Sequence, residues 1–132
     1  MIRVDLIAPR DLTARDIFWL ALGCKNSIDE GLRAVDQVDS ALAGRSGIYR
    51  VSGDAEGIFV LTQDGKKMLI TALAGKGFLK FFSEVHEGIL TAASACGASS
   101  VAGFVTRKGL ALAYKTKTQA RFAEYFEEEL AR

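Results

Sequence analysis

The feature that most constrains this chain is a segment predicted to pass from a strand through a glycine turn into a long helix. The strand is predicted over Met68–Leu73, the turn over Ala74–Gly77 and the helix over Phe78–Cys96. Backbone N–H groups at a helix start have no partner within the helix, and the helix dipole places partial positive charge there. Because glycines let an anion approach closely, the turn is a candidate phosphate site. A purely structural glycine turn is the alternative interpretation.

Composition limits the class of protein. The chain has 132 residues, of which 49% are hydrophobic, so we expect one globular domain. The formal net charge is +1, and no segment interleaves aromatic and basic residues as a nucleic-acid platform would. No apolar run reaches membrane-spanning length and the start lacks a secretory pattern, which predicts a cytoplasmic protein. One histidine and no Cys-x-x-Cys argue against a metal site, and Cys24 and Cys96 are expected to be buried thiols.

The N-terminal part is predicted to contain one strand and two helices. Apolar and charged residues alternate over Met1–Ala8, which indicates a strand. Asp11 or Thr13 can cap a first helix, with Thr13–Asp16 resembling a capping box, and we expect this helix to end at Gly23. Ser27–Glu30 forms a capping box for a second helix that ends at Gly44. The predicted apolar stripe of this second helix consists of Ile28, Leu32, Val35, Val38 and Leu42.

The remaining segments predict an antiparallel meander followed by a crossover. The meander strands are expected at Gly47–Ser52, Ile58–Gln63 and Lys67–Leu73. After the long helix come a strand at Ser100–Val105, which should pair in parallel with the third meander strand, and a short helix at Arg107–Lys115. The composition of the last segment, Gln119–Arg132, favours a helix.

This order of elements resembles that of the GCN5-related N-acetyltransferase (GNAT) family over nearly the whole chain. In that family the loop after the fourth strand binds the pyrophosphate of acetyl-coenzyme A, with the pattern Arg or Gln, two residues, Gly, one residue, then Gly or Ala. Here Ala72 stands at the Arg or Gln position, and Gly75 and Gly77 match the small residues. The cofactor-binding residues that the resemblance implies are Leu73, Gly75, Lys76, Gly77 and Phe78.

The resemblance implies a single α/β domain over residues 1–132. Its mixed central sheet would contain the antiparallel meander and would carry helices on both faces. The fourth and fifth strands would splay apart, with the pantetheine arm between Leu69–Leu73 and Val101–Val105. Continuous pairing of these two strands would exclude the family. The last segment should then begin as a strand near Gln119–Tyr125, so strand and helix both stay open there.

The resemblance also suggests where catalysis would occur. A tyrosine on the fourth helix of the family often protonates the departing thiolate, and Tyr114 falls at about that place. A tyrosine at the edge of the core is the alternative. No carboxylate lies on the third meander strand, and Asp54 or Glu56 in the preceding turn could take the proton of an amine, although both are typical solvated turn residues. Water could also take that proton.

Three further groups carry structural interpretations. His86 is expected to be a structural histidine at the surface or partly buried on the long helix. Glu127–Glu129 should form a solvated face. Ile17–Trp19 are three consecutive large apolar residues that a helix cannot bury on one stripe, so one of them should face a partner or a substrate.

The sequence leaves two functions open. The first is an acetyl-coenzyme A-dependent N-acyltransferase, in which an acceptor amine attacks the thioester directly. The second is a GNAT-fold protein that has lost chemistry and serves as a structural or interaction module among protein partners, such as a component of a bacteriophage virion, which would place it in the virion. A small α/β interaction domain unrelated to GNATs is a third possibility, because fold alone does not establish function.

Overall fold

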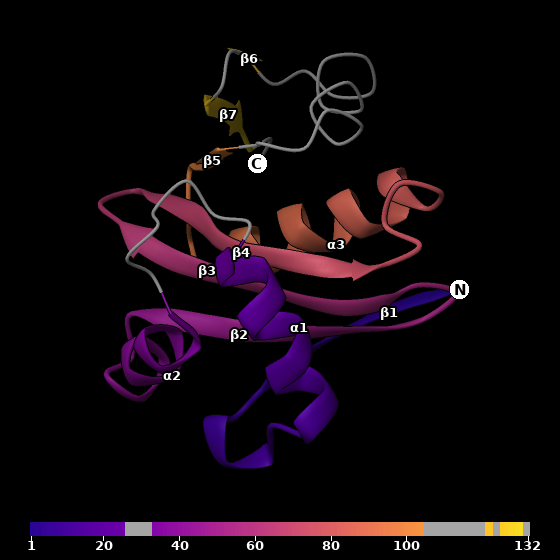
Figure 1. Cartoon of the computed structure of the whole chain (residues 1–132). Coiled ribbons are helices and arrows are strands. Elements are labelled where there is room, and N and C mark those ends of the chain that lie inside the picture. Colours follow the sequence, from indigo (N-terminus) through magenta and orange to yellow (C-terminus); the bar gives the residue numbers. More distant parts are fainter. Residues whose placement is uncertain (26–32, 105–120, 123–124, 131–132) are drawn as a thin grey trace.

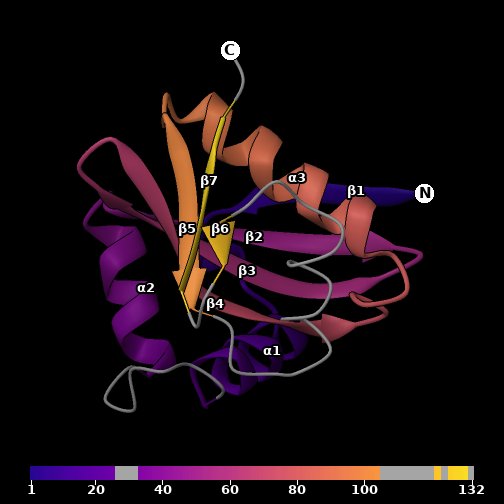
Figure 2. The ribbon, with the colours of Figure 1, turned by 90° about the horizontal axis from the view of Figure 1, so that it is seen from above.

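The computed structural model describes residues 1–25, 33–104, 121–122 and 125–130, and these form one seven-stranded mixed sheet with helices on both faces (Figures 1 and 2). The strand order is β1-β2-β3-β4-β5-β7-β6. The strands are β1 (Ile2–Ile7), β2 (Ser46–Gly53), β3 (Glu56–Asp64), β4 (Lys67–Lys76), β5 (Ser100–Phe104), β6 (Arg121–Phe122) and β7 (Tyr125–Glu129). The helices are a 3₁₀ turn (Pro9–Asp11), α1 (Ala14–Lys25), α2 (Ala34–Leu42) and α3 (Phe82–Ala95).

The predicted meander and crossover are confirmed. Strands β1 to β4 pair antiparallel in sequence order, and β4 pairs in parallel with β5 across the crossover helix α3. One boundary is wrong: β4 continues through Ala74 and Gly75 to Lys76, where a turn was predicted. Pairing with the start of β3 keeps these residues extended, since Glu56 lies opposite Lys76.

Helix α1 begins as predicted but does not end at Gly23. The Thr13 N–H donates to Asp16 Oδ2 at 2.9 Å and the Asp16 N–H donates to Thr13 Oγ1 at 3.1 Å, which is the expected capping box. The helix continues to Lys25. A Cβ added at Gly23 would lie 3.1 Å from the Leu73 nitrogen, so the glycine allows α1 to pass closely over β4 and does not stop the helix.

The predicted apolar stripe of the second helix is wrong in two places. Within α2, Val35 is 50% exposed and Leu42 is 69% exposed. The buried residue is Gln37, at 2% exposure, because its amide finds hydrogen-bond partners on β4. The predicted capping box at Ser27–Glu30 lies outside the described residues. A single helix from there to Leu42 is wrong, because Arg33 has an extended backbone and α2 begins after it, at Ala34.

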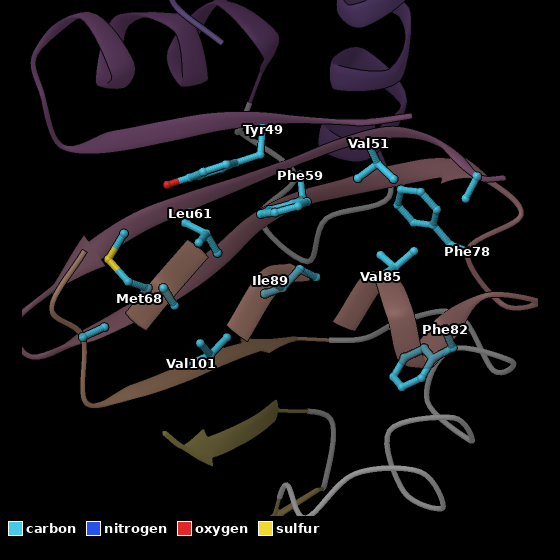
Figure 3. Close-up of a cluster of buried hydrophobic side chains, with 13 residues drawn as sticks. Tyr49, Val51, Phe59, Leu61, Met68, Phe78, Phe82, Val85, Ile89 and Val101 are labelled. Atoms are coloured by element: carbon cyan, nitrogen blue, oxygen red, sulfur yellow. The ribbon is translucent and has the colours of Figure 1, made fainter. Parts of the chain in front are cut away.

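Two clusters of buried side chains pack on the two faces of the sheet. The cluster under α3 is shown in Figure 3. Within it, the Tyr49 and Phe59 rings stack, with their centroids 4.9 Å apart. The opposite cluster lies under α1 and α2 and consists of Leu20, Cys24, Ile48, Ile58, Val60 and Ala72. Cys24 is buried as expected, whereas Cys96 is exposed at the end of α3.

The end of the chain forms strands. β7 pairs antiparallel with β5 and with β6, so the strand implied by the GNAT resemblance is confirmed and the helix suggested by composition is wrong for the described residues. Glu128 does not belong to a solvated face, because its side chain is only 14% exposed and its Oε1 lies 3.1 Å from His86 Nε2. His86 is a buried residue of α3 whose ring stacks on Phe82.

None of the described helices is both long and apolar enough to cross a membrane.

Candidate functional site

Strand β4 changes its pairing halfway along its length. Lys67–Ile70 pairs with β3 on one side and with β5 on the other. The last β4–β5 pair is Ile70 with Gly103, and over Thr71–Lys76 the pairing among described residues is with β3 alone. Among the described residues the β4–β5 ladder therefore ends at Ile70, and β5 is described only one residue further, to Phe104. The splay that the GNAT resemblance implies stays a prediction.

The end of the described β4–β5 ladder coincides with a β-bulge at Thr71. Ile70 pairs with Leu61 and Ala72 pairs with Val60, so Thr71 is an extra residue on β4. The amide of Gln37 bridges this residue: Nε2 donates to the Thr71 carbonyl oxygen at 3.2 Å, and Oε1 accepts from the Thr71 hydroxyl at 3.1 Å. A buried amide is thereby satisfied at both ends, and it stabilises the bulge.

A row of hydroxyl groups extends this contact across the sheet. Thr71 Oγ1 lies 2.9 Å from Thr62 Oγ1, which lies 2.8 Å from Ser46 Oγ, which lies 2.6 Å from Ser40 Oγ on α2. The row joins α2 to three adjacent strands. The role of Gln37 was not predicted from the sequence. The one local signal was an amide side chain in the middle of a predicted helix.

The turn after β4 presents free backbone donors. Gly77 has φ 83°, and its carbonyl accepts the Phe81 N–H at 3.0 Å, which starts a helical turn ahead of α3. The N–H groups of Phe78, Leu79 and Lys80 donate to no acceptor within the part of the chain that the structure describes. Such groups at a helical start are the donors that bind anions in proteins. The predicted start of the regular helix at Phe78 is four residues early.

Gly75 is explained by packing. A Cβ at Gly75 would lie 2.5 Å from the Glu56 carbonyl oxygen and from the Phe78 ring, and a Cβ at Gly57 would lie 2.7 Å from the same ring. The buried Phe78 ring therefore covers both glycines, which are paired across β3 and β4. Of the five predicted cofactor-binding residues, Gly75 and Phe78 shape the turn and Gly77 supplies its positive φ. The side chain of Leu73 packs against the cluster under α3.

Two lysines flank the free donors. Lys76 ends β4 and Lys80 follows the turn, and both are exposed. The Lys80 Nζ lies 5.5 Å from the centroid of the Phe81 ring. Lys76 was predicted as a ligand of the phosphate, whereas Lys80 was missed, although lysines four residues apart around a glycine turn were a visible signal.

The two candidate carboxylates lie near the C-terminal end of β4, and not at Ile70, where the described β4–β5 ladder ends. Glu56 lies opposite Lys76 and accepts from Arg15 Nε at 2.9 Å. The hydrogen bond from Arg15 holds the pKa of Glu56 below its usual range, and Lys76 adds to this effect. Asp54 contacts the amino group of Met1. Both carboxylates are ion-paired, so they are not simply solvated turn residues.

Ala72 is buried against α1. Its Cβ would lie 3.3 Å from a Cβ added at Gly23, so the space between β4 and α1 holds no longer side chain. This close approach gives a physical reason why an Arg or Gln is absent at the position implied by the family pattern.

Tyr114 and the short helix at Arg107–Lys115 lie outside the described residues, so the general-acid role stays a prediction. Of Ile17–Trp19, the first two side chains are exposed on α1, and Trp19 packs against the cluster under α1 and α2. The described part of the chain contains no group of three or more His, Cys, Asp or Glu residues placed to hold a metal ion.

Comparison with known proteins gives structural matches alone. No family model matches the sequence, and no curated protein matches it. The structure is similar to a probable acetyltransferase from Staphylococcus epidermidis ATCC 12228, with a TM-score of 0.73 and 13% identity over 99% of this chain and 100% of that one. It is also similar to the ribosomal-protein-S18-alanine N-acetyltransferase from Escherichia coli, with a TM-score of 0.65 and 8% identity over 100% of this chain and 96% of that one.

A third match names the family. It is an acetyltransferase of the GNAT family from Staphylococcus aureus Mu50, with a TM-score of 0.59 and 10% identity over 99% of this chain and 100% of that one. At such identities the likeness concerns the fold and not the activity. Together these matches show that this chain has a GNAT-like fold.

Proposed function

We propose that the chain binds an acyl-coenzyme A and transfers its acyl group to an amine. One observation carries the proposal: the half of β4 that is paired on a single edge leads directly into a turn with free N–H groups flanked by two lysines. An extended, amide-containing molecule with a diphosphate at one end matches both parts. The strand edge would bond its amides and the turn would bind its anion.

The turn would bind the diphosphate through the N–H groups of Phe78, Leu79 and Lys80. Lys76 and Lys80 would add positive charge without fixed geometry, as lysine ammonium groups do around phosphates. Gly77 is required for the positive φ that starts this turn. The predicted contacts of Leu73, Gly75 and Phe78 with the cofactor would be made through their backbone, because their side chains are absent or packed on the protein itself.

The reaction would follow from this placement. The amine nitrogen attacks the thioester carbonyl carbon, and a backbone N–H of β4 beyond the bulge polarises the carbonyl oxygen as negative charge develops there. The tetrahedral intermediate collapses, the carbon–sulfur bond breaks and the thiolate leaves. Tyr114 is proposed to protonate this thiolate, and the proton of the amine passes to water, since neither Glu56 nor Asp54 lies at the end of the described β4–β5 ladder.

A second candidate is a GNAT-fold module without chemistry, for which a bacteriophage virion component is one setting. The observation that favours it is the engagement of both nearby carboxylates in ion pairs, together with Ala72 in place of a longer polar residue. Such a module would act through protein partners. Binding of the cofactor without turnover of any amine would support it.

Calorimetric titration with acetyl-coenzyme A tests the proposal. A ligand at 100 times its Kd should stabilise the chain by about 2.7 kcal/mol in a parallel unfolding measurement. The double change Lys76→Glu and Lys80→Glu should weaken binding by at least about tenfold, because two charges near the phosphates are reversed. Lys66 is an exposed lysine directly before the other end of β4. Lys66→Glu is therefore the control and should leave binding unchanged.

No binding at millimolar cofactor would reject the acyltransferase. If binding and turnover occur, Tyr114→Phe tests the acid role through kcat at saturating cofactor. Unchanged turnover in that variant would remove Tyr114 from the mechanism. Changes at Gly75 are unsuited to this purpose, because any side chain there collides with Phe78.

A further inference from the structure

Strand β1 leaves one backbone edge without a partner among the described strands. It is the first strand of the sheet and pairs with β2 alone. The Asp54 N–H donates to the Met1 carbonyl oxygen at 3.3 Å, which sets the alternation of this antiparallel ladder. The odd-numbered residues of β1 therefore bond to β2, and the even-numbered ones direct their N–H and C=O groups outward. These outward residues are Ile2, Val4 and Leu6.

The same three residues form an apolar row, in which Leu6 is exposed and Ile2 and Val4 are partly buried against the cluster under α3. Together with α3 they line a groove of ≈ 650 Å³ on the α3 face of the sheet. Leu6 is 66% exposed, and Met1, which comes directly before β1, is 92% exposed. Arg3 and Asp5 lie on the opposite face, with Arg3 Nε 2.9 Å from Asp5 Oδ2. β1 contains neither a proline nor a bulge, two of the devices that protect an edge from pairing, and its two charged side chains are of opposite sign.

We propose that β1 pairs antiparallel with β1 of a second copy of this chain, about a two-fold axis at Val4. In this register Val4 lies opposite the partner's Val4, and Ile2 lies opposite the partner's Leu6. All three outward residues of each strand then form hydrogen-bonded pairs. The two seven-stranded sheets would become one continuous sheet.

Charge selects this register over its neighbours. With Val4 opposite Val4, each Arg3 faces the partner's Asp5 at a closely spaced, non-hydrogen-bonded position. A shift of two residues in one direction places Arg3 opposite Arg3, and a shift in the other direction places Asp5 opposite Asp5. The sequence Ile-Arg-Val-Asp-Leu-Ile is thus complementary to itself in one register, which argues for a second copy as the occupant of the edge.

A charge exchange tests this register. Sedimentation equilibrium should show a concentration-dependent dimer for the wild-type chain. Arg3→Asp places acid opposite acid and Asp5→Arg places base opposite base, so each variant alone should dimerise at least about tenfold more weakly. An equimolar mixture of the two variants pairs unlike charges again and should recover the dimer. In a register with residue 3 opposite residue 3, or residue 5 opposite residue 5, the wild-type chain already pairs like charges, so one of the two variants would not weaken the dimer and the mixture would bind more tightly than the wild type. Weakening in both variants, with recovery to the wild-type level in the mixture, identifies the register with residue 3 opposite residue 5.

A backbone change tests the hydrogen bonds independently. Leu6→Pro removes an outward N–H that β2 does not use, and edge strands accept proline at such positions. Leu6→Ala keeps the N–H and is the matched control, so Leu6→Pro should weaken the dimer beyond the effect of Leu6→Ala. Thermal unfolding checks that each variant is folded. A wild-type chain that stays monomeric at about 1 mM, the weak end of specific association, would overturn the proposal. A dimer that survives both same-charge variants would also overturn it.

Discussion

The two halves of β4 have similar apolar sequences but different surroundings. Over Lys67–Ile70 both backbone edges are hydrogen-bonded, and the strand is an interior part of the sheet. Over Thr71–Lys76 the edge that faces away from β3 has no described strand beside it. A candidate site can therefore be made from backbone groups that the described sheet leaves unpaired, with few polar side chains.

The change between the halves has a local cause. At the bulge, Thr71 and Ala72 both direct their side chains toward the α1 and α2 face, one to Gln37 and the other to the cluster beneath α1. An extra residue of this kind bends and twists a strand, and the described β4–β5 ladder ends at the residue before it. The first half is thus held by two neighbouring strands, whereas the second half depends on β3, on α1 and on the contacts of Gln37.

The largest effect is expected at Gly75, in the second half. Gly75→Ala places a Cβ 2.5 Å from the Glu56 carbonyl oxygen and the Phe78 ring, and overpacking of this kind should destabilise the chain by about 3 kcal/mol. Gly77→Ala is the matched control, because its Cβ meets atoms at no less than 3.4 Å and its cost of about 1 kcal/mol comes from the positive φ. Urea unfolding measures both. Equal costs would contradict the role given to the Phe78 ring.

A smaller effect is expected at Gln37, which ties the bulge to α2. Gln37→Leu removes both hydrogen bonds to Thr71, and the unsatisfied carbonyl should cost about 2 kcal/mol. Amide hydrogen exchange should quicken over Ala72–Lys76 and stay unchanged over Met68–Ile70. Thr71→Val keeps the carbonyl that Gln37 Nε2 contacts and should change exchange less. Uniform quickening along β4 would show that the halves are not independent.

The smallest effect concerns the anchor of α1, which covers the second half. Asp16 accepts from Arg50 Nε at 2.9 Å, and this hydrogen bond holds the pKa of Asp16 below its usual range. A depressed pKa gives stability that is present above the unfolded-state pKa of about 3.9 and is lost as pH falls through the folded-state value. Asp16→Asn should therefore cost about 1 kcal/mol at pH 7 and progressively less on acidification.

Unfolding curves at several pH values measure this difference between Asp16→Asn and the wild-type chain. Asp39→Asn, at an exposed position on α2, is the matched control. A cost for Asp16→Asn that is constant from pH 7 to about pH 2 would contradict the ion-pair explanation.

Local patterns predicted the order of elements well, because each pattern depends on residues close together in the chain. Hydrophobic alternation identified β1, the Asp64–Gly65 turn identified the hairpin of β3 and β4, and the crossover predicted that β4 and β5 are parallel. The boundaries at Gly23 and Gly75 could not be predicted in this way. Each glycine is needed because another segment packs too closely for a side chain, and the local sequence does not show that contact.

Local sequence is enough to predict that a strand, a glycine turn and a helix follow one another at residues 67–95, since hydrophobic period and glycine conformations are local properties. The groups that this turn can offer to a ligand depend on tertiary contacts. The Phe78 ring occupies the space beside Gly75, and the backbone donors with no acceptor among the described residues belong to Phe78, Leu79 and Lys80. Gln37 holds the bulge from 34 positions away in the chain, and such a contact exists only when α2 has packed on the sheet. The physical reason is that hydrogen-bond satisfaction and close packing are properties of the assembled fold.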